Sequence, residues 1–434
     1  MARQGRGATR HRLRRPELID PLDEIIRIEG GQVLATLIRL TGDIDRAEDA
    51  LHDAVVVAAD AWRRDGAPDK PGAWLTTVAR NKALDRLRRE ARRAPKEEEA
   101  FRLLTEGSGM DDGANVADAD TATASRDDRL RLLFTCCHPA LSPESQVVLA
   151  LRTICGLSTV DIARVFLVPD ATIGQRISRA KAKIAKARIP YRVPEPHELP
   201  DRLRPVLTTV YAVFTAGHHA PFGELDARLD LSDEAIRLAR VLVELMPDEA
   251  ECIGLLALTL ATDARRLARS DDAGNIVLLA DQDRSLWNMA AITEASALVE
   301  SVLRRGRPGA YQMQAAIACL HGSAPTYADT DWPQIAELYR LLETSWPTPV
   351  VRVNRAVAVA EVAGPAAGLA MLADLVGSAA ERWHLYWSTR ADFQRRLGET
   401  TAAIDSYRRA LECPCNDSDR RFLHRRLTEL EATE

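Results

Sequence analysis

Residues 134–142, with the sequence FTCCHPALS, place two thiols and an imidazole side by side at Cys136, Cys137 and His138. Thiolate and imidazole groups are ligands that zinc prefers, and neighbouring thiols can also carry redox chemistry. A structural zinc site needs four such ligands, however, and no second Cys/His pair stands at zinc-finger spacing in the sequence. We therefore expect no metal site here, and we expect the chain to use no cofactor.

Two other groups of side chains could take part in chemistry. The stretch LLADQDRSLW holds Asp281 and Asp283 beside an arginine, and paired carboxylates can act as acid and base. Without a supporting histidine, such a pair is more typical of a capped turn. Cys413 and Cys415 could form a thiol switch, but no basic residue directly beside them would favour the thiolate. The sequence also lacks a Ser/His/Asp set and a glycine-rich phosphate loop, so we expect no enzyme activity.

The composition favours a large, mainly helical, cytoplasmic protein. The chain has 434 residues, enough for two to four domains, and 46% of them are hydrophobic but only 5% aromatic. No run of 18 apolar residues could span a membrane, and no apolar segment follows the basic start as in a signal peptide. The seven cysteines are scattered and odd in number, which favours a reducing compartment over a disulfide framework.

The net charge of −5 conceals an asymmetry along the chain. Residues 1–190 carry 32 Lys and Arg against 28 Asp and Glu, whereas residues 191–434 carry 26 against 35. Within the first part, residues 80–96 hold eight positive and two negative side chains, and residues 170–188 hold six and one. Such clusters are typical of solvated helix faces and of nucleic-acid-binding surfaces. Opposite charge could let the two parts dock on each other, or simply keep a large helical domain soluble.

The pattern around the two cysteines predicts a joint between helices. Apolar side chains in residues 130–137 recur at i, i+3, i+4 and i+7, which places Cys137 on the buried stripe of a helix. His138–Pro139 ends that helix, because the residue before proline disfavours helical geometry. Ser142, followed by a proline, is a typical N-cap of a next helix that Gly156 can end.

A short helix at residues 159–167, a tight turn and a basic helix at residues 171–188 follow. This order is typical of a helix-turn-helix, whose second helix enters the major groove of DNA. We expect its inner face to hold Ile173, Ile177, Ala180 and Ile184. We expect DNA contacts from Thr172, Gln175, Arg176, Ser178, Arg179 and Lys183. An amphipathic surface helix without DNA would show a similar division of polar and apolar residues.

A second basic helix lies earlier, in the stretch KPGAWLTTVARNKALDRLRRE. We expect its inner face to hold Leu75, Val78, Leu84 and Leu87. The candidate DNA-contacting residues are Trp74, Arg80, Asn81, Arg86, Arg88 and Arg89. Arginines suit phosphates, while asparagine and tryptophan suit an unpaired base through hydrogen bonding and stacking. The alternative is a packed tryptophan and a solvated asparagine.

Together, these two helical modules resemble an extracytoplasmic-function (ECF) sigma factor, a promoter-recognition subunit of bacterial RNA polymerase. The resemblance covers about residues 18–188. Residues 47–53, AEDALHD, resemble the core-binding motif of sigma region two, and the helix of residues 74–89 resembles its minus-ten reader. Residues 141–180 are similar to region four, which reads the minus-thirty-five element. The resemblance implies that RNA polymerase core and promoter DNA are partners, with core contacts at Asp49, His52, Asp53 and Trp62. Position 52 is His where the family usually has Gln, and Gly174 replaces a common polar residue.

About 245 residues follow the sigma-like part, and they predict further helices. Residues 387–411 fit the small and large positions of a tetratricopeptide (TPR) repeat, and Gly364 stands one repeat period of 34 residues before Gly398. The extension also resembles that of a sigma subgroup with a helical, repeat-bearing C-terminal domain. We expect it to be regulatory, with a protein partner at the repeats.

The sequence thus predicts an all-α protein that acts as a sigma factor and initiates transcription. Its expected parts are a basic disordered tail (1–17), region two (18–94), an acidic flexible linker (95–125), region four (126–190), a helical extension (191–300) and TPR-like repeats forming a solenoid (301–434). Two alternatives remain: a helix-turn-helix regulator with a TPR-like sensor that needs no polymerase, and a thiol or metal enzyme.

Overall fold

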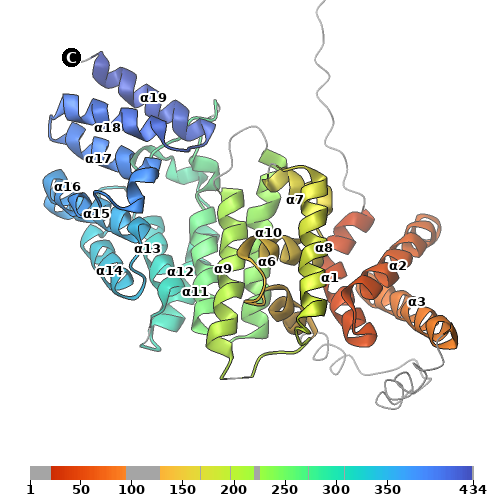
Figure 1. Cartoon of the computed structure of the whole chain (residues 1–434). Coiled ribbons are helices and arrows are strands. Elements are labelled where there is room, and N and C mark those ends of the chain that lie inside the picture. Colours follow the sequence, from red (N-terminus) through yellow and green to blue (C-terminus); the bar gives the residue numbers. More distant parts are fainter. Residues whose placement is uncertain are drawn as a thin grey trace, which may run out of the picture. The chain divides into compact units, whose positions relative to one another are not determined.

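A computed structural model describes residues 21–93, 128–166, 168–195, 197–218, 225–271, 273–306 and 308–432 (Figure 1). These residues are helical apart from their loops and one isolated bridge between Ser270 and Ile276. None of the helices within these ranges has the length and apolar character needed to cross a membrane. The predicted tail (1–17) and linker (95–125) lie outside the described residues.

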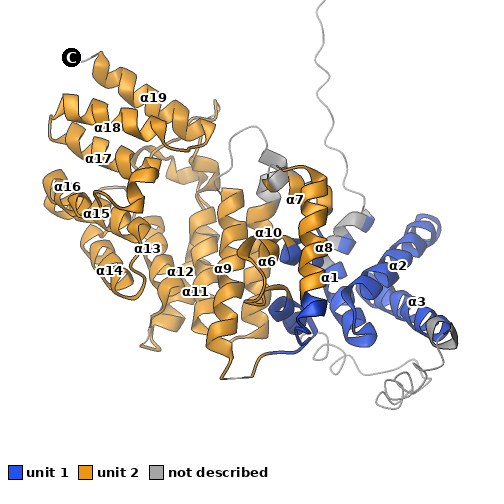
Figure 2. Cartoon of the chain, in the orientation of Figure 1, with its two compact units in different colours: residues 1–135, 149–158, 184–193 blue, residues 136–148, 159–183, 194–434 orange. Residues whose placement is uncertain are grey.

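The chain divides into two compact units (Figure 2). The first contains residues 1–135, 149–158 and 184–193, and the second contains the rest. The helices of the sigma-like part are α1 (Pro21–Thr41), α2 (Ile44–Asp65), α3 (Pro71–Arg93), residues 128–136, α6 (Pro143–Thr153), α7 (Thr159–Phe166) and α8 (Asp170–Lys186).

The extension continues as a series of helices. They are α9 (Leu199–His218), α10 (Leu225–Leu245), α11 (Ala250–Asp263), α12 (Met289–Leu303), α13 (Ala310–Ser323), α14 (Trp332–Ser345), α15 (Pro349–Ala363), α16 (Pro365–Ala373), α17 (His384–Arg396), α18 (Thr400–Glu412) and α19 (Asp417–Glu431). Four short 3-10 helices lie between them: η1 (Arg266–Ala268), η2 (Leu279–Asp281), η3 (Arg284–Leu286) and η4 (Ala379–Arg382).

In the first unit, α1, α2 and α3 pack on one another. Helix α2 begins at the N-cap Asp43, whose carboxylate accepts from the backbone N–H of Arg46, and it ends at Gly66, which has a φ of 82°. Its buried face consists of small residues, Ala47, Ala50, Ala54 and Ala58, together with Ile44. Because alanine leaves little side chain between helix axes, α2 can approach its neighbours closely.

The buried face of α3 differs in part from the predicted one. Leu75 is fully buried as predicted, but the other fully buried positions in the middle of the helix are Ala79 and Ala83. Val78, Leu84 and Leu87 are only half-buried. Leu75, Ala79 and Ala83 are spaced four residues apart and lie on one face of α3. This face, with its two alanines, is the one that α3 buries where the three helices pack closely.

The region-four helices agree closely with the sequence expectations. Ser142 Oγ accepts from the backbone N–H of Ser145 at 3.3 Å as α6 begins, and Gly156 adopts a φ of 70° after it ends. The predicted inner face of α8 is confirmed, since Ile173, Ile177, Ala180 and Ile184 are all buried.

Helix α11 lies at the centre of the extension, with every residue from Cys252 to Ala261 buried. Further along, α15 with α16 and α17 with α18 form two helical hairpins. Gly364 and Gly398 hold the turns of these hairpins with φ angles of 88° and 79°, a region that favours glycine. The equivalent turns, 34 residues apart, support the expected repeat, whose assignment as TPR-like stays a prediction.

Candidate nucleic-acid interface

A cavity of about 560 Å³ lies beside the first half of α3. Arg80 and Asn81, two of the predicted DNA-contacting residues, belong to its lining, together with Lys70 from the loop before α3 and Arg39 from α1. The side chains of Arg80 and Asn81 are exposed, and neither forms a hydrogen bond or ion pair within the described structure. They are therefore available to a ligand in the cavity.

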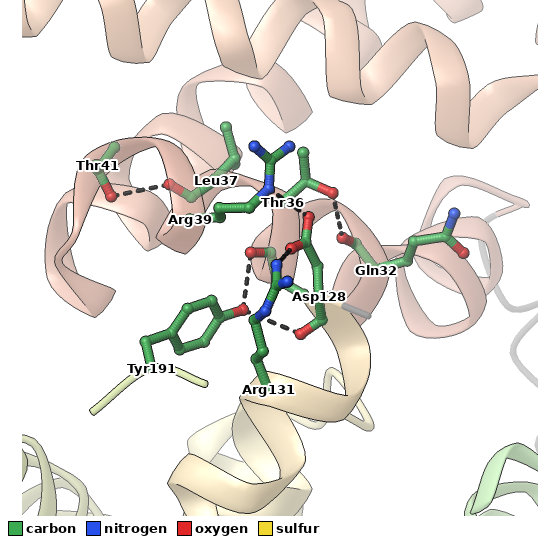
Figure 3. Close-up of polar contacts among 9 residues, drawn as sticks. Gln32, Thr36, Leu37, Arg39, Thr41, Asp128, Arg131 and Tyr191 are labelled. Carbon is green, nitrogen blue, oxygen red and sulfur yellow. Dashed lines mark hydrogen bonds and ion pairs between the residues drawn. The ribbon is translucent and has the colours of Figure 1, made fainter. Parts of the chain in front are cut away.

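The lining also includes Asp128, a buried carboxylate that the sequence did not point to. Figure 3 shows its polar contacts. Asp128 is 1% exposed and accepts from Arg39 Nε at 2.9 Å and from Arg131 Nη1 at 2.7 Å. The hydroxyl of Tyr191 lies between two backbone carbonyl oxygens, at 2.8 Å from that of Ala35 and 3.1 Å from that of Asp128. These bonds tie α1, the helix at residues 128–136 and the segment after α8 together.

Trp74 lies elsewhere. Its ring packs against Trp62 near the end of α2, with a centroid distance of 5.4 Å and an interplanar angle of 59°. Trp74 is half-buried and does not line the cavity that Arg80 and Asn81 share. The contact of Trp74 with Trp62 agrees with the packed tryptophan of the alternative, while Asn81 is exposed at the cavity. The assignment of both residues to an unpaired base stays a prediction.

Arg86 also differs from its neighbours on α3. Its Nη1 donates to Asp49 at 2.7 Å and its Nη2 donates to Asp53 at 2.8 Å, across the α2–α3 contact. Burial works to lower the pKa of Arg86, but the two carboxylates raise it above its ordinary value. The predicted DNA-contacting Arg86 therefore belongs with the predicted core-binding residues Asp49 and Asp53.

Arg88 and Arg89 are exposed and lie toward the C-terminal end of α3. Arg88 lies 3.8 Å from Asp85, a distance typical of a weak surface ion pair, and Arg89 Nε donates to the Asp85 carbonyl at 3.1 Å. Both guanidinium groups can still contact a phosphate.

On α2, the predicted core-binding face contains a residue that sequence reasoning missed. His52 is exposed beside Asp49 and Asp53, and Val56 follows one helical turn after His52 with 51% of its surface exposed. The helical period places Trp62 on another face, where it contacts Trp74. The signal in the sequence was the helical period, which places Val56 on the same face as Asp49, His52 and Asp53.

The outer face of α8 is open. Gln175, Ser178, Arg179 and Lys183 are exposed, while Thr172 and Arg176 are half-buried. Residues 159–183 and the extension belong to the same compact unit, and no acidic side chain of its described residues pairs with Arg176, Arg179 or Lys183. Docking of the acidic extension on the basic helices stays a prediction.

The residues that suggested metal or catalytic chemistry have structural partners. Burial raises the pKa of the Cys137 thiol to about 12, although a hydrogen bond with Thr209 and the charge of Arg202 act in the opposite direction. A thiol with that pKa stays protonated at neutral pH and is a poor metal ligand. Asp283 accepts from the Ser285 N–H at 2.9 Å and so caps η3, as the capped-turn interpretation predicted. Across the described ranges, no three His, Cys, Asp or Glu side chains gather as metal ligands would.

Comparison with known proteins defines the class. Residues 25–93 match the family Sigma-70 region 2, and residues 131–184 match Sigma-70, region 4. The chain therefore has a sigma factor's role in promoter recognition. Sigma factors are a class of non-enzymatic DNA-binding regulators.

The extension is also shared with other proteins. Residues 202–303 match a family of unknown function, DUF6596. An uncharacterized protein of Rhizobium meliloti (strain 1021) is 43% identical over 404 residues, which cover 92% of this chain and 94% of that protein. The chain belongs to the ECF sigma factors that carry a long C-terminal extension.

Proposed function

We propose that this sigma factor binds RNA polymerase core through α2, opens the minus-ten element at the cavity beside α3 and reads the minus-thirty-five element with α8. The extension regulates these steps. The observation that carries the proposal is the pair Arg80 and Asn81 on α3, two polar side chains that line one cavity and have no partner within the described part of the chain.

The cavity fits the chemistry of strand opening. Unstacking a base costs a few kcal/mol, and binding of the flipped base in a pocket offsets this cost. A volume of about 560 Å³ lies within the range of pockets that hold small ligands. The Asn81 amide can both donate to and accept from a base edge, and Arg80 can neutralise the adjoining phosphate.

Core binding is assigned to the exposed face of α2. Arg86 holds Asp49 and Asp53 in one orientation, and His52 and Val56 extend the same face. An exposed valine beside oriented charged groups gives this face both an apolar contact and polar contacts for a partner protein. Because core binding and strand opening use different sides of the three-helix group, single substitutions can separate the two activities.

Transcription with reconstituted bacterial core polymerase tests the proposal, on templates that the wild-type holoenzyme selects from a randomised duplex pool. The Asn81→Ala variant should bind core normally and yield much less open complex. Asp85→Ala, an exposed change on the same helix away from the cavity, is the matched control and should behave as wild type. If the wild-type chain bound duplex DNA specifically but never associated with core polymerase, it would be a helix-turn-helix regulator and the proposal would be wrong.

A further inference from the structure

Four side chains of the extension bury polar atoms that have no hydrogen-bond partner among the described residues. The atoms are Arg265 Nε, Arg284 Nη2, Trp287 Nε1 and His321 Nδ1. Both guanidinium groups lie over the Trp287 ring, with the Cζ of Arg284 at 4.3 Å and the Cζ of Arg265 at 5.8 Å from its centroid. The four residues come from three segments of the chain and meet in one cluster, which we call the arginine cluster.

The surrounding contacts hold the arginine cluster in place. The backbone N–H of Asn288 donates to the Ala264 carbonyl at 2.8 Å, which joins the end of η3 to the end of α11. Arg284 Nη1 donates to the carbonyls of His321 and Ala324, at the C-terminal end of α13. That edge of the guanidinium is thereby fixed, while Nη2 has no acceptor in the described ranges.

The cluster has positive charge but no ion-paired acid among the described residues. Arg266, one position along the chain, contacts Asp233 and Asp263 at 2.7 Å each, whereas neither Arg265 nor Arg284 contacts a described carboxylate in this way. Asp329 lies near enough to oppose the lowering of the Arg284 pKa that burial causes, but it does not form an ion pair with Arg284. Neighbouring Arg269 adds a third positive charge and donates to the His218 carbonyl.

This arrangement is costly unless a ligand completes it. A buried donor without an acceptor costs about 1–3 kcal/mol, and more when it is charged. Burial and the charges of Arg269 and Arg284 lower the pKa of Arg265 to about 10, which reflects the same unfavourable environment. Stacking on Trp287 compensates only in part, because cation–π contacts contribute about 0.5–2 kcal/mol.

We propose that the arginine cluster is a binding site for a small oxyanion, the carboxylate or phosphate group of a dissolved metabolite. Arg265, Arg284 and the Trp287 indole would donate to the oxyanion, and His321 would form the edge of the site. A small anion fits better than a protein surface, because the four donor atoms are recessed although the arginines and the histidine are only half-buried. The site does not depend on the proposed contacts with polymerase.

Thermal unfolding of the full chain tests the site, with inorganic phosphate and acetate each added at constant ionic strength and chloride as the reference. One of the two anions should raise the unfolding midpoint, by about 3–6 °C at ten times its Kd. A response to phosphate alone or to acetate alone identifies the group that the site takes. The absence of a response to both would overturn the proposal.

Variants locate the effect. Arg265→Gln should weaken binding about tenfold or more, because it removes charge-assisted hydrogen bonds. Arg304→Gln, which alters an exposed arginine directly after α12, should leave the response unchanged. Equal responses of Arg265→Gln and wild type would mean that the anion binds elsewhere.

Stability without added anion provides a second check. Arg265→Gln removes an unpaired charge that neighbouring arginines repel, so its unfolding midpoint in chloride buffer should equal or exceed that of wild type. A clearly lower midpoint would show that Arg265 is a structural residue, and the assignment of a ligand to it would be wrong.

Discussion

Arg86 and Asp53 join α3 to α2 through a bond of 2.8 Å between Nη2 and Oδ2. The same guanidinium donates to Asp49 through Nη1. The sequence had placed Arg86 with the DNA-contacting residues and the two acids with the core-binding residues. In the folded chain all three form one surface, so we assign Arg86 the role of orienting the acids.

We therefore expect Arg86→Ala to weaken core binding more than DNA binding. Released carboxylates lose their fixed orientation, and the loss of two partly exposed ion pairs should lower the free energy of unfolding by only about 0.5–1.5 kcal/mol. Affinity for core polymerase, measured alongside Arg89→Ala as a control on the same helix, checks this. If the variant bound core polymerase normally but opened promoters poorly, Arg86 would be a DNA-contacting residue, as the sequence predicted.

The Trp62–Trp74 contact predicts a stability effect for Trp74→Ala. The substitution removes an aromatic pair and leaves a gap between α2 and α3, which should cost about 2–4 kcal/mol. Urea denaturation measures it, and Trp74→Phe should recover most of the loss because it keeps an aromatic ring. If Trp74→Ala were as stable as wild type but failed in promoter opening, stacking on an unpaired base would explain Trp74 better.

On α8, Arg179→Ala should weaken binding of the holoenzyme to duplex DNA at the upstream element. A bidentate contact with guanine would contribute about 1–3 kcal/mol of discrimination at one base pair. An arginine that contacts only phosphate would weaken all sequences alike and reduce the salt slope by about one. Binding to selected and scrambled duplexes across a salt series distinguishes the two contacts, and unchanged binding throughout would show that this face does not meet DNA.

Tyr191→Phe should destabilise the first unit without changing its shape. It removes a hydroxyl that lies within hydrogen-bond distance of the Ala35 and Asp128 carbonyls, and hydrogen bonds contribute about 0.5–1.5 kcal/mol each. Hydrogen exchange should increase in α1 and in residues 128–136, while α17 and α18 keep their protection. Equal hydrogen exchange in the variant and the wild type would mean that the Tyr191 hydroxyl contributes nothing measurable to stability.

His321 predicts a dependence of stability on pH. Burial and the charges of Arg265 and Arg284 lower its pKa in the folded chain to about 4. The unfolded chain, with an ordinary histidine pKa of about 6.5, then binds more protons between these values, so stability falls as pH falls from about 6.5 to 4. The loss should reach roughly 1–3 kcal/mol, and His321→Gln in chloride buffer should reduce this slope. An unaltered slope in the variant would assign the effect to other groups.

The sequence by itself determined the helical class, the helix-turn-helix and the two hairpin turns at Gly364 and Gly398. These features depend on local physics: apolar residues recur at the helical period, a serine caps α6, and glycine adopts a positive φ at a turn. The inner face of α8 followed correctly from its four apolar positions. Each such inference uses residues within a few turns of one another.

Tertiary structure decided which polar side chains share a site. Arg86 and Asp53 are 33 residues apart, and Tyr191 reaches the Ala35 carbonyl across 156 residues. It also placed Trp74 against Trp62, and it brought Arg265 and Arg284 over the Trp287 ring next to His321. The helical period tells which residues share a face, but only packing decides what that face meets, because an ion pair or an unpartnered donor depends on chain segments that the local pattern does not connect.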